Sequence, residues 1–323
     1  WLESGDPATA ANPAYTNLSK NIAPALCPYD SGTAETVTNF GQDSSFAGNK
    51  TAQGNQDGNS IGDFYYTPPT GFLALCTSNL PAVAVIPSEH FNAVAYTGDG
   101  VAAASGGQDI AVGFQPDFVW IKNLPRTESH NLFDVLRGVT EYLTSNGTGG
   151  DYDHDETLMS FDSNGFNLGS ENSVNRDTEG YISWNWKANG SGSANANGTI
   201  TTTATSANVD AGFSISTYTG TGSNATVGHG LSVAPEVGII KRRDATDDWM
   251  TYYGDNTDYV IINGTQATAD AATVWNDTST TASVFSIGTA GGVNASSGTY
   301  LAYCFHSVDG YSKVGSYTGN GNA

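Results

Sequence analysis

The chain has 323 residues, with 11 Lys and Arg against 32 Asp and Glu, so its formal net charge is -21. Such an acidic chain lacks the basic stripe that nucleic acid or anionic lipid requires. No run of about 18 apolar residues is present, which is the minimum for a membrane-spanning helix. We therefore expect neither nucleic-acid binding nor membrane insertion.

The composition favours an all-β fold. Glycine occurs 39 times, and Tyr, Phe and Trp supply most of the large apolar side chains, as in short strands joined by many turns. Three cysteines (Cys27, Cys76 and Cys304), without a CxxC spacing, give neither a disulfide framework nor a zinc site. Pairing of Cys27 with Cys76 stays open, and buried free thiols are the default.

Residues 1–80 are predicted to be the C-terminal part of a β domain. They run through polar turns and close on two apolar stretches, Phe64–Tyr66 and Phe72–Leu75, around a turn at Pro68–Gly71. These stretches are read as strands or as an ordered closing segment. Residues 81–90 are predicted to be a linker, because Pro81 and Pro87 stiffen a short run.

An internal repeat organises the rest of the chain. In both copies a Val-Asn pair lies eight residues after a Phe, and a Tyr follows seven residues after that Val: Phe166, Val174, Tyr181 and Phe285, Val293, Tyr300. The strand after each Tyr then alternates in the same way, with Ile182, Trp184, Trp186 matched by Leu301, Tyr303, Phe305. A period of two puts each set of three on one strand face. We expect that face to be the inside of each repeat.

Three Tyr-Thr-Gly triplets mark the starts of repeats, at Tyr96, Tyr218 and Tyr317. They predict repeat 1 over 91–188, repeat 2 over 211–308 and the start of a third repeat over 309–323. Each full unit has the size of a small β-sandwich, of jelly-roll or concanavalin-like type. Residues 189–210 are rich in Gly, Ser and Asn, and are predicted to be a flexible linker between two separate cores.

Little in the sequence points to catalysis. The five histidines show no zinc-ligand spacing, and no nucleophile motif is present. The densest acidic cluster is Asp151, Asp153, Asp155 and Glu156, which offers several oxygens to Ca²⁺ but lacks the EF-hand pattern. The alternatives are a calcium site, which would make Ca²⁺ the one cofactor, or a solvated acidic loop.

Two tryptophans near polar loops, Trp249 and Trp275, are candidates for stacking on sugar rings, with core packing as the alternative. Recognition is expected on loops rather than on strands. The longest loops that the repeats do not share are 123–131 and 144–157 in repeat 1, and 244–248 and 264–273 in repeat 2.

Several stretches resemble a repeat module of structural proteins of marine, cyanophage-like tailed phages. These stretches are Phe114–Lys122, Leu132–Gly138, Ser183–Ala188, Val274–Thr278 and Tyr317–Gly321. Gly62–Pro81 is similar to the segment that closes a SPRY-like, concanavalin-like domain in the same proteins. The resemblance supplies no catalytic residue.

The resemblance implies a non-enzymatic virion protein, a tail fibre or appendage that displays host-receptor-binding β modules. Its partners would be other virion proteins, copies of itself (as a trimer) and a host surface glycan or protein. The alternatives are a capsid decoration or head-fibre protein, or a secreted or cell-surface carbohydrate-binding adhesin.

Overall fold

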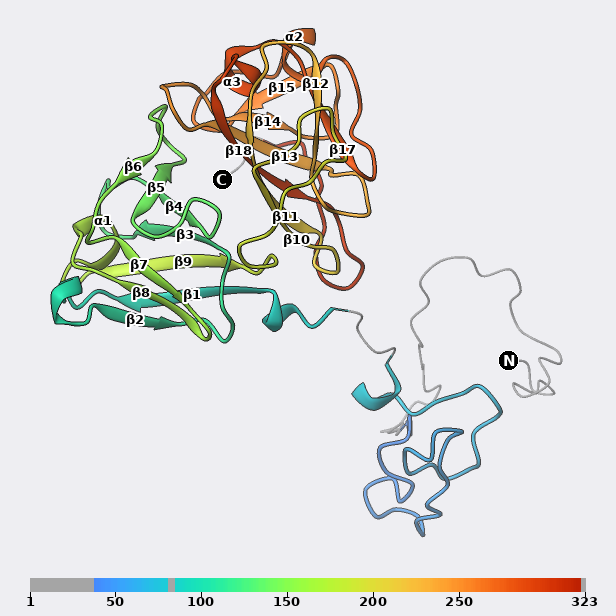
Figure 1. The fold of residues 1–323 in the computed structure, drawn as a ribbon. Helices are drawn as coiled ribbons and strands as arrows, with labels where there is room; N and C mark the ends of the chain where they lie inside the picture. The colour runs from blue at the N-terminus through green and yellow to red at the C-terminus, as the bar shows by residue number, and fades with distance from the viewer. Residues whose placement is uncertain (1–37, 81–84, 321–323) are drawn as a thin grey trace. The chain divides into compact units, whose positions relative to one another are not determined.

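The computed structural model describes residues 38–80 and 85–320. The chain divides into two compact units, Trp1–Ala82 and Val83–Ala323. Eighteen strands and three short α-helices lie in the described residues, so the predicted all-β class is confirmed (Figure 1). None of the described helices has the length and hydropathy that a bilayer crossing requires. Cys27 and the rest of residues 1–37 of the predicted 1–80 domain lie outside the described residues.

The described part of the first unit is a loop structure built around one carboxylate. Asp57 accepts hydrogen bonds from the backbone N–H groups of Ala74 (2.8 Å) and Ile61 (3.0 Å) and from Asn79 Nδ2 (2.7 Å). Phe64 makes only an isolated bridge with Asn55, and residues 72–75 form no strand. The strand interpretation of this segment is therefore wrong, and the alternative of an ordered segment that closes a domain stays a prediction.

Repeat 1 contributes two antiparallel sheets to the second unit. The larger has the order β1-β9-β3-β4-β5-β6, and the smaller β2-β8-β7. Their strands are β1 (Phe91–Thr97), β2 (Gln108–Ala111), β3 (Phe118–Asn123), β4 (Asn131–Asp134), β5 (Glu141–Thr144), β6 (Tyr152–Asp153), β7 (Leu158–Asp162), β8 (Gly165–Leu168) and β9 (Gly180–Trp186), with helix α1 (Asn172–Asn175) before β9.

Repeat 2 has the same plan. Its larger sheet has the order β10-β11-β18-β13-β14-β15-β16, and its smaller sheet pairs β12 with β17. The elements are β10 (Ala204–Asn208), β11 (Phe213–Thr219), β12 (Ala225–Gly228), β13 (Val237–Arg242), β14 (Met250–Tyr252), β15 (Asp258–Ile261), β16 (Ala269–Asp270), α2 (Ala272–Trp275), β17 (Val284–Ile287), α3 (Gly291–Asn294) and β18 (Thr299–Phe305).

The sequence repeat corresponds to a repeated structure. In repeat 1 the rings of Tyr96 and Tyr181 stack at 5.2 Å, and the Tyr96 hydroxyl donates to the Val174 carbonyl at 2.7 Å. In repeat 2 Tyr218 stacks on Tyr300 at 5.1 Å, and the Tyr218 hydroxyl donates to the Val293 carbonyl at 2.7 Å. The asparagine after each Val is fully buried and ties the Thr-Gly turn to the helix: Asn175 accepts from Asp99 N, and Asn294 from Thr221 N.

The aromatic face of the closing strands lies between the repeats. Tyr303 and Leu301 of β18 share one buried cluster with Phe118 and Leu132 of repeat 1, and Trp186 of β9 packs against this cluster. The opposite faces line each repeat's own core, with Tyr181 on one side and Tyr300 on the other. The alternation was therefore predicted correctly. The assignment of this face to the inside of a single repeat was wrong.

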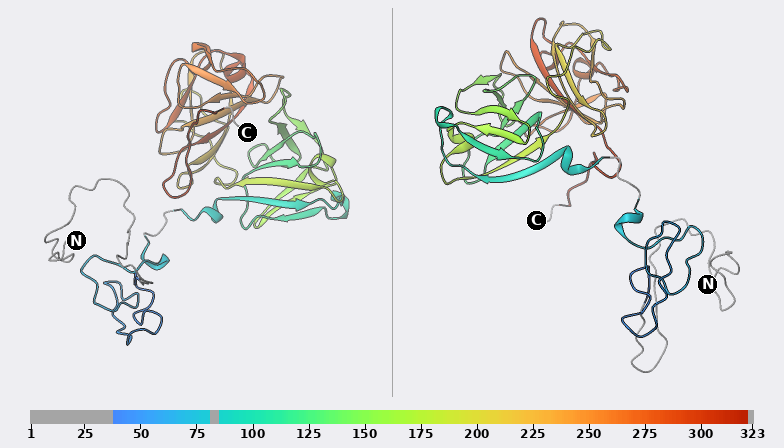
Figure 2. Two further views of the ribbon diagram at one scale, coloured as in Figure 1. Left: turned by 180° about the vertical axis from the view of Figure 1, so that it is seen from behind. Right: turned by 60° about the horizontal axis from the view of Figure 1, so that its bottom comes forward.

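Phe118 lies at the centre of this shared core. Its ring is 4.2 Å from that of Tyr303, 5.1 Å from Trp186 and 6.0 Å from Phe213, and only 2% of its surface is exposed. Figure 2 shows the green repeat 1 and the yellow-to-red repeat 2 side by side within the Val83–Ala323 unit. The two larger sheets thus bury one face each against the other repeat.

Residues 189–210 are structured, which contradicts the predicted flexible linker. Strand β10 pairs along β11, and Ile200 and Thr202 are 6% and 2% exposed. The hydroxyl groups of Thr202, Thr205 and Ser216 form a hydrogen-bonded chain with 2.9 and 3.0 Å contacts. Small hydroxyl residues therefore cover the edge of a sheet here, whereas their composition alone resembles that of a linker.

Truncation of Phe118 should weaken the whole Val83–Ala323 unit. We expect Phe118→Ala to lower the unfolding free energy by about 3–5 kcal/mol, because it removes a fully buried ring. Calorimetry should show the transition of both repeats moving together, since the cavity opens in the core that they share. A repeat 2 transition that stays in place while another shifts would show that the repeats fold independently.

Candidate functional site

The clearest polar constellation in the described residues lies where the two repeats meet. We call it the joint cluster: Asp134, Arg137, Asp151, Arg243 and Tyr303. Arg137 Nε lies 2.6 Å from Asp134 Oδ2, and both side chains are completely buried. The Tyr303 hydroxyl of repeat 2 donates to the same Asp134 oxygen at 2.9 Å. Asp134 thus accepts hydrogen bonds from side chains of both repeats.

Asp151 extends the cluster toward the surface. Its Oδ2 lies 2.7 Å from Arg243 Nε of repeat 2, and its Oδ1 lies 3.5 Å from Arg137. The Asp151 N–H also donates to the Arg243 carbonyl at 2.8 Å. Each arginine therefore reaches a carboxylate of repeat 1, and charge on one repeat is balanced by charge on the other.

Two of the predicted recognition loops meet at this joint. Asp247 N of the 244–248 loop donates to the Thr148 carbonyl of the 144–157 loop at 2.9 Å. Lys241 Nζ donates to the same carbonyl at 3.1 Å. Trp249, 0% exposed, donates from Nε1 to the Thr144 carbonyl at 3.0 Å. Parts of these loops hold the repeats together, while Asp153 and Asp155 of the 144–157 loop remain exposed.

The charges of the joint are tuned by their surroundings. Burial tends to lower the pKa of the Arg137 guanidinium, but Asp134, Tyr303 and Asp151 together outweigh this and raise the pKa above its ordinary value. Burial raises the pKa of the Tyr303 phenol well above its ordinary value. The arginine is therefore charged and the tyrosine neutral at any physiological pH, which suits a fixed structural contact.

Lys241 differs from its counterpart in repeat 1. Its side chain is buried, and burial lowers its pKa to about 8, against the opposing effect of Asp247 and Asp151. Lys122, at the matching position, donates to the carbonyls of Asn123, Arg126 and Glu128 in its own repeat and is only half-buried. Repeat 2 thus uses this lysine to reach across the joint.

The four carboxylates predicted to hold Ca²⁺ do not converge. Asp151 belongs to the joint cluster, and Asp153 and Asp155 are exposed. Glu156 turns the other way and accepts from the N–H groups of Ala103 and Ser170, both at 2.9 Å, which lowers its pKa. In the residues that the structure describes, no three His, Cys, Asp or Glu side chains are placed to bind a metal.

The two tryptophans predicted to contact a glycan are core residues. Trp249 lies in the shared core, and Trp275 is 2% exposed and donates from Nε1 to the Asp258 carbonyl at 3.1 Å. The prediction of glycan contact is wrong for both. Partly exposed indoles are instead found at Trp120 and Trp184, whose rings meet edge to face at 6.2 Å. In the sequence, the alternation of Trp120 and Trp184 with their neighbours predicted that each lies on one face of a strand, but not that this face is partly exposed.

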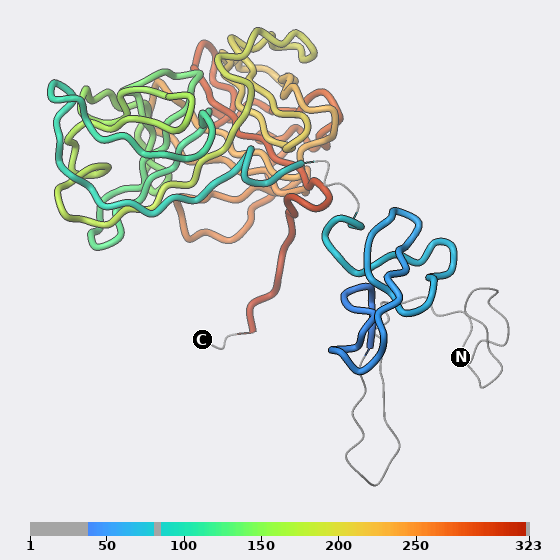
Figure 3. The backbone as a smooth tube through the Cα atoms, turned by 90° about the horizontal axis from the view of Figure 1, so that it is seen from below, coloured from blue at the N-terminus to red at the C-terminus, as the bar shows by residue number. Residues whose placement is uncertain are grey.

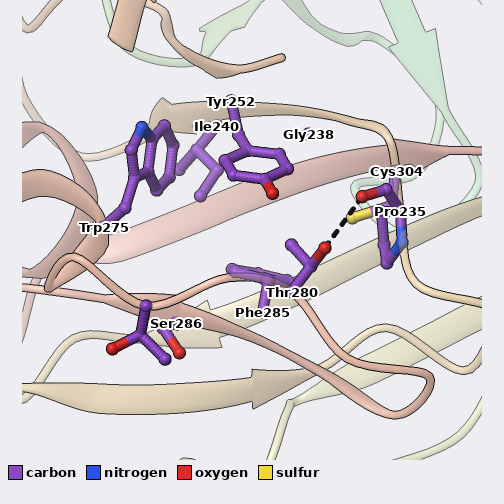
Figure 4. Close-up of a pocket in the computed structure, with 10 residues that line it drawn as sticks. Pro235, Gly238, Ile240, Tyr252, Trp275, Thr280, Phe285, Ser286 and Cys304 are labelled. Atoms are coloured by element: carbon purple, nitrogen blue, oxygen red, sulfur yellow. Dashed lines mark hydrogen bonds between the residues drawn. The ribbon is translucent and has the colours of Figure 1, made fainter. Parts of the chain in front are cut away.

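A small enclosed cavity lies in the core of repeat 2 and has a volume of about 10 Å³ (Figure 4). Trp275, Tyr252, Phe285 and Cys304 are among its lining residues, and Thr280 closes one end by donating to the Pro235 carbonyl at 2.9 Å. Burial raises the pKa of the Cys304 thiol to about 12, so this sulfur stays a thiol. The space is about large enough for one water molecule and too small for a substrate.

The family follows from a comparison of the chain with known protein families. The model of a domain of unknown function, DUF7483, matches residues 86–323. The chain belongs to this family. The match begins just before β1 and covers the shared core and the joint cluster, so both repeats are parts of one DUF7483 domain. No curated protein and no solved structure matches the chain.

Loss of the Arg137 side chain should destabilise the DUF7483 domain strongly. Arg137→Met leaves Asp134 buried without its charged partner, and breaking a buried pair in this way costs about 3–5 kcal/mol. The double variant Arg137→Met/Asp134→Leu removes both charges and should recover most of that loss. Denaturant titration measures both changes. A double variant as unstable as the single one would show that the pair is not the source of the effect.

Lys241 should give the domain a stability that rises with pH. Its folded-state pKa of about 8 lies below the ordinary value of 10.5, so the folded state loses this proton first. Between pH 7.5 and 9.5 the unfolded state binds more protons, and the unfolding free energy should increase by about 1–3 kcal/mol. Lys241→Met should abolish the rise, and Lys122→Met should leave it. A rise that persists in Lys241→Met would assign it to another group.

Proposed function

We propose that this DUF7483 chain is a non-enzymatic structural protein of a phage virion, a tail fibre or related appendage. The observation that carries the proposal is the shared aromatic core, which joins two repeats through Phe118, Trp186 and Tyr303. A pair of repeats fixed in this way transmits force and holds a constant spacing. The resemblance of Phe114–Lys122 and Ser183–Ala188 to phage modules supplies the virion context.

In this proposal each repeat is a β-sandwich, made of one larger and one smaller sheet over its own core. The buried clusters around Phe166 and Phe285 agree with that description. The enclosed space of about 10 Å³ and the fixed ionisation of Arg137 and Tyr303 suit a structural part better than a catalyst. Other virion proteins and further copies of the chain are the proposed partners, and the virion the proposed location.

A second candidate, a carbohydrate-binding adhesin, is favoured by one observation. Trp120 and Trp184 are only half-buried, although they lie on the same face of the β1-β9-β3 sheet as Phe118 and Trp186, and the Trp120 indole is fixed by a 3.0 Å hydrogen bond to His130 Nδ1. A fixed, partly exposed indole presents an apolar face and a polar edge to a ligand. Glycan binding that Trp184→Ala removes and Trp275→Phe, a core change, retains would favour this candidate.

Antibodies against this chain should label the tail or its fibres on intact particles. Immunogold electron microscopy of purified virions measures the position, and antibody pre-absorbed with the chain is the control. We expect gold at the tail, since the repeats are proposed to space out an appendage. Gold on the head would favour capsid decoration. Label confined to bacterial surfaces, with bare particles, would contradict the virion proposal.

A further inference from the structure

Strand β1 leaves an open edge where its counterpart in repeat 2 is covered. Residues 91–97 match 213–219 one for one, as their pairing with β9 and β18 shows. In repeat 2 the far side of β11 is paired with β10. In repeat 1 β1 is the last strand of its sheet, within the described residues. Accordingly β11 is buried along almost its whole length, whereas β1 alternates between half-buried and exposed.

The groups at this edge can be assigned from the hydrogen bonds at the two ends of β1. Lys187 N donates to the His90 carbonyl, and Gly98 N to the Glu179 carbonyl. Backbone groups alternate in direction along an antiparallel pair, so the even-numbered residues bond to β9. The N–H and C=O groups of Phe91, Ala93 and Ala95 therefore point away from the sheet. Their counterparts in β11 are paired with β10.

The edge carries none of the features that protect exposed strands from pairing. Charged side chains, prolines and bulges are the usual protection. Strand β1 reads Phe-Asn-Ala-Val-Ala-Tyr-Thr, and its pairing with β9 runs without a register shift. The opposite edge of the same sheet is the two-residue β6, which carries Asp153. An edge strand of seven uncharged residues without these features favours pairing with a further strand.

The C-terminal segment of the chain begins beside this edge. The ring of Tyr311 lies against that of His90, the residue before β1, with centroids 6.2 Å apart. Ser312 N then donates to the Val308 carbonyl and Val314 N to Ser307 Oγ, both at 2.9 Å. Residues 315–319 lead away from the body as the dark red end of the tube in Figure 3. Tyr317 is 94% exposed. Lys313 is the only charged residue of 311–319, and Glu89 lies beside the start of β1.

The two segments match in register. Tyr317 lies six positions after Tyr311, and Tyr96 lies six positions after His90. Placing Tyr311 beside His90 in a parallel pair therefore puts Tyr317-Thr-Gly beside Tyr96-Thr-Gly. Tyr96 already stacks on Tyr181. A parallel strand over 312–318 would extend this pair to three tyrosines and cover Tyr96, whose counterpart Tyr218 is 1% exposed.

We propose that residues 312–318 add to β1 of the same chain as a parallel edge strand. The segment does for repeat 1 what β10 does for repeat 2: it satisfies the outward N–H and C=O groups of β1 and buries its half-exposed side chains. In the structure the start of this segment is held by the contacts of Tyr311, Ser312 and Val314, and residues 315–318 are exposed. Strand addition of this kind supplies main-chain hydrogen bonds and side-chain contacts together.

A designed disulfide tests the register. In the full chain with Cys27→Ser and Cys76→Ser, the pair Ala95→Cys/Ser316→Cys places two thiols side by side, within the 4.4–6.8 Å Cα separation that disulfides need. The pair Ala95→Cys/Thr318→Cys is the matched control, because two residues move the thiol by about 6.6 Å along a strand. We expect an intrachain disulfide in the first pair and little in the second.

Other outcomes of this experiment overturn the proposal. Equal yields in both pairs would indicate a mobile tail without register, and no disulfide would show that the segment does not reach β1. A disulfide found only in covalent dimers would assign the strand to a second copy.

Hydrogen exchange gives an independent measure: a chain ending at Tyr311 should exchange the Ala93 and Ala95 amides about tenfold faster. The Val94 and Tyr96 amides, which face β9, should be unaffected.

Discussion

The architecture of the DUF7483 domain depends on one constraint: both faces of β18, a central strand of the larger sheet of repeat 2, are apolar. A strand with a period of two has two faces, and a sheet exposed on one side normally keeps that side polar. Here β18 places Tyr300, Ala302 and Cys304 on one face and Leu301 and Tyr303 on the other, and all five are buried. Such a sheet requires cover on both sides. The other repeat provides the second cover, and the joint follows from this need.

The polar joint cluster is a consequence of the same packing. Bringing the faces of two sheets together buries the end of β4 against β18, and with it the carboxylate of Asp134. A buried carboxylate is unfavourable unless it is paired and hydrogen-bonded. Arg137, Tyr303 and the turn N–H of Leu136 supply these partners. The apolar core thus sets the separation of the repeats. Two polar contacts that cross the joint, Tyr303 to Asp134 and Arg243 to Asp151, fix their register.

The sequence predicted the repeated structure but not the packing of one repeat against the other. Tyr96, Val174 and Tyr181 recur in repeat 2 at matching spacings, and these spacings predicted a repeated structure that the ring stacking bears out. Periodicity also grouped Trp184 with Trp186. It could not tell which face of β9 meets its own repeat, because that face carries the buried polar residues Ser183 and Asn185, whereas the tryptophan face is the more apolar one. Residues 189–210 misled for another reason: Thr202, Thr205 and Ser206 are buried through hydroxyl hydrogen bonds, which hydrophobicity does not register.

The contacts of the joint cluster could not be predicted from the sequence either. The spacing of Asp134 and Arg137 after a strand was visible in the sequence, but their burial depends on Tyr303, 169 residues away from Asp134. Asp151 was predicted as a metal ligand because its neighbours are acidic; its actual partner, Arg243, lies 92 residues on. Contacts of this range decide whether an acidic side chain is a ligand, a solvated charge or half of an ion pair. A dense run of carboxylates in one loop does not indicate which distant residues contact it. A repeated structure is more informative, because the covered edge of β11 in repeat 2 identifies the edge of β1 in repeat 1 as uncovered.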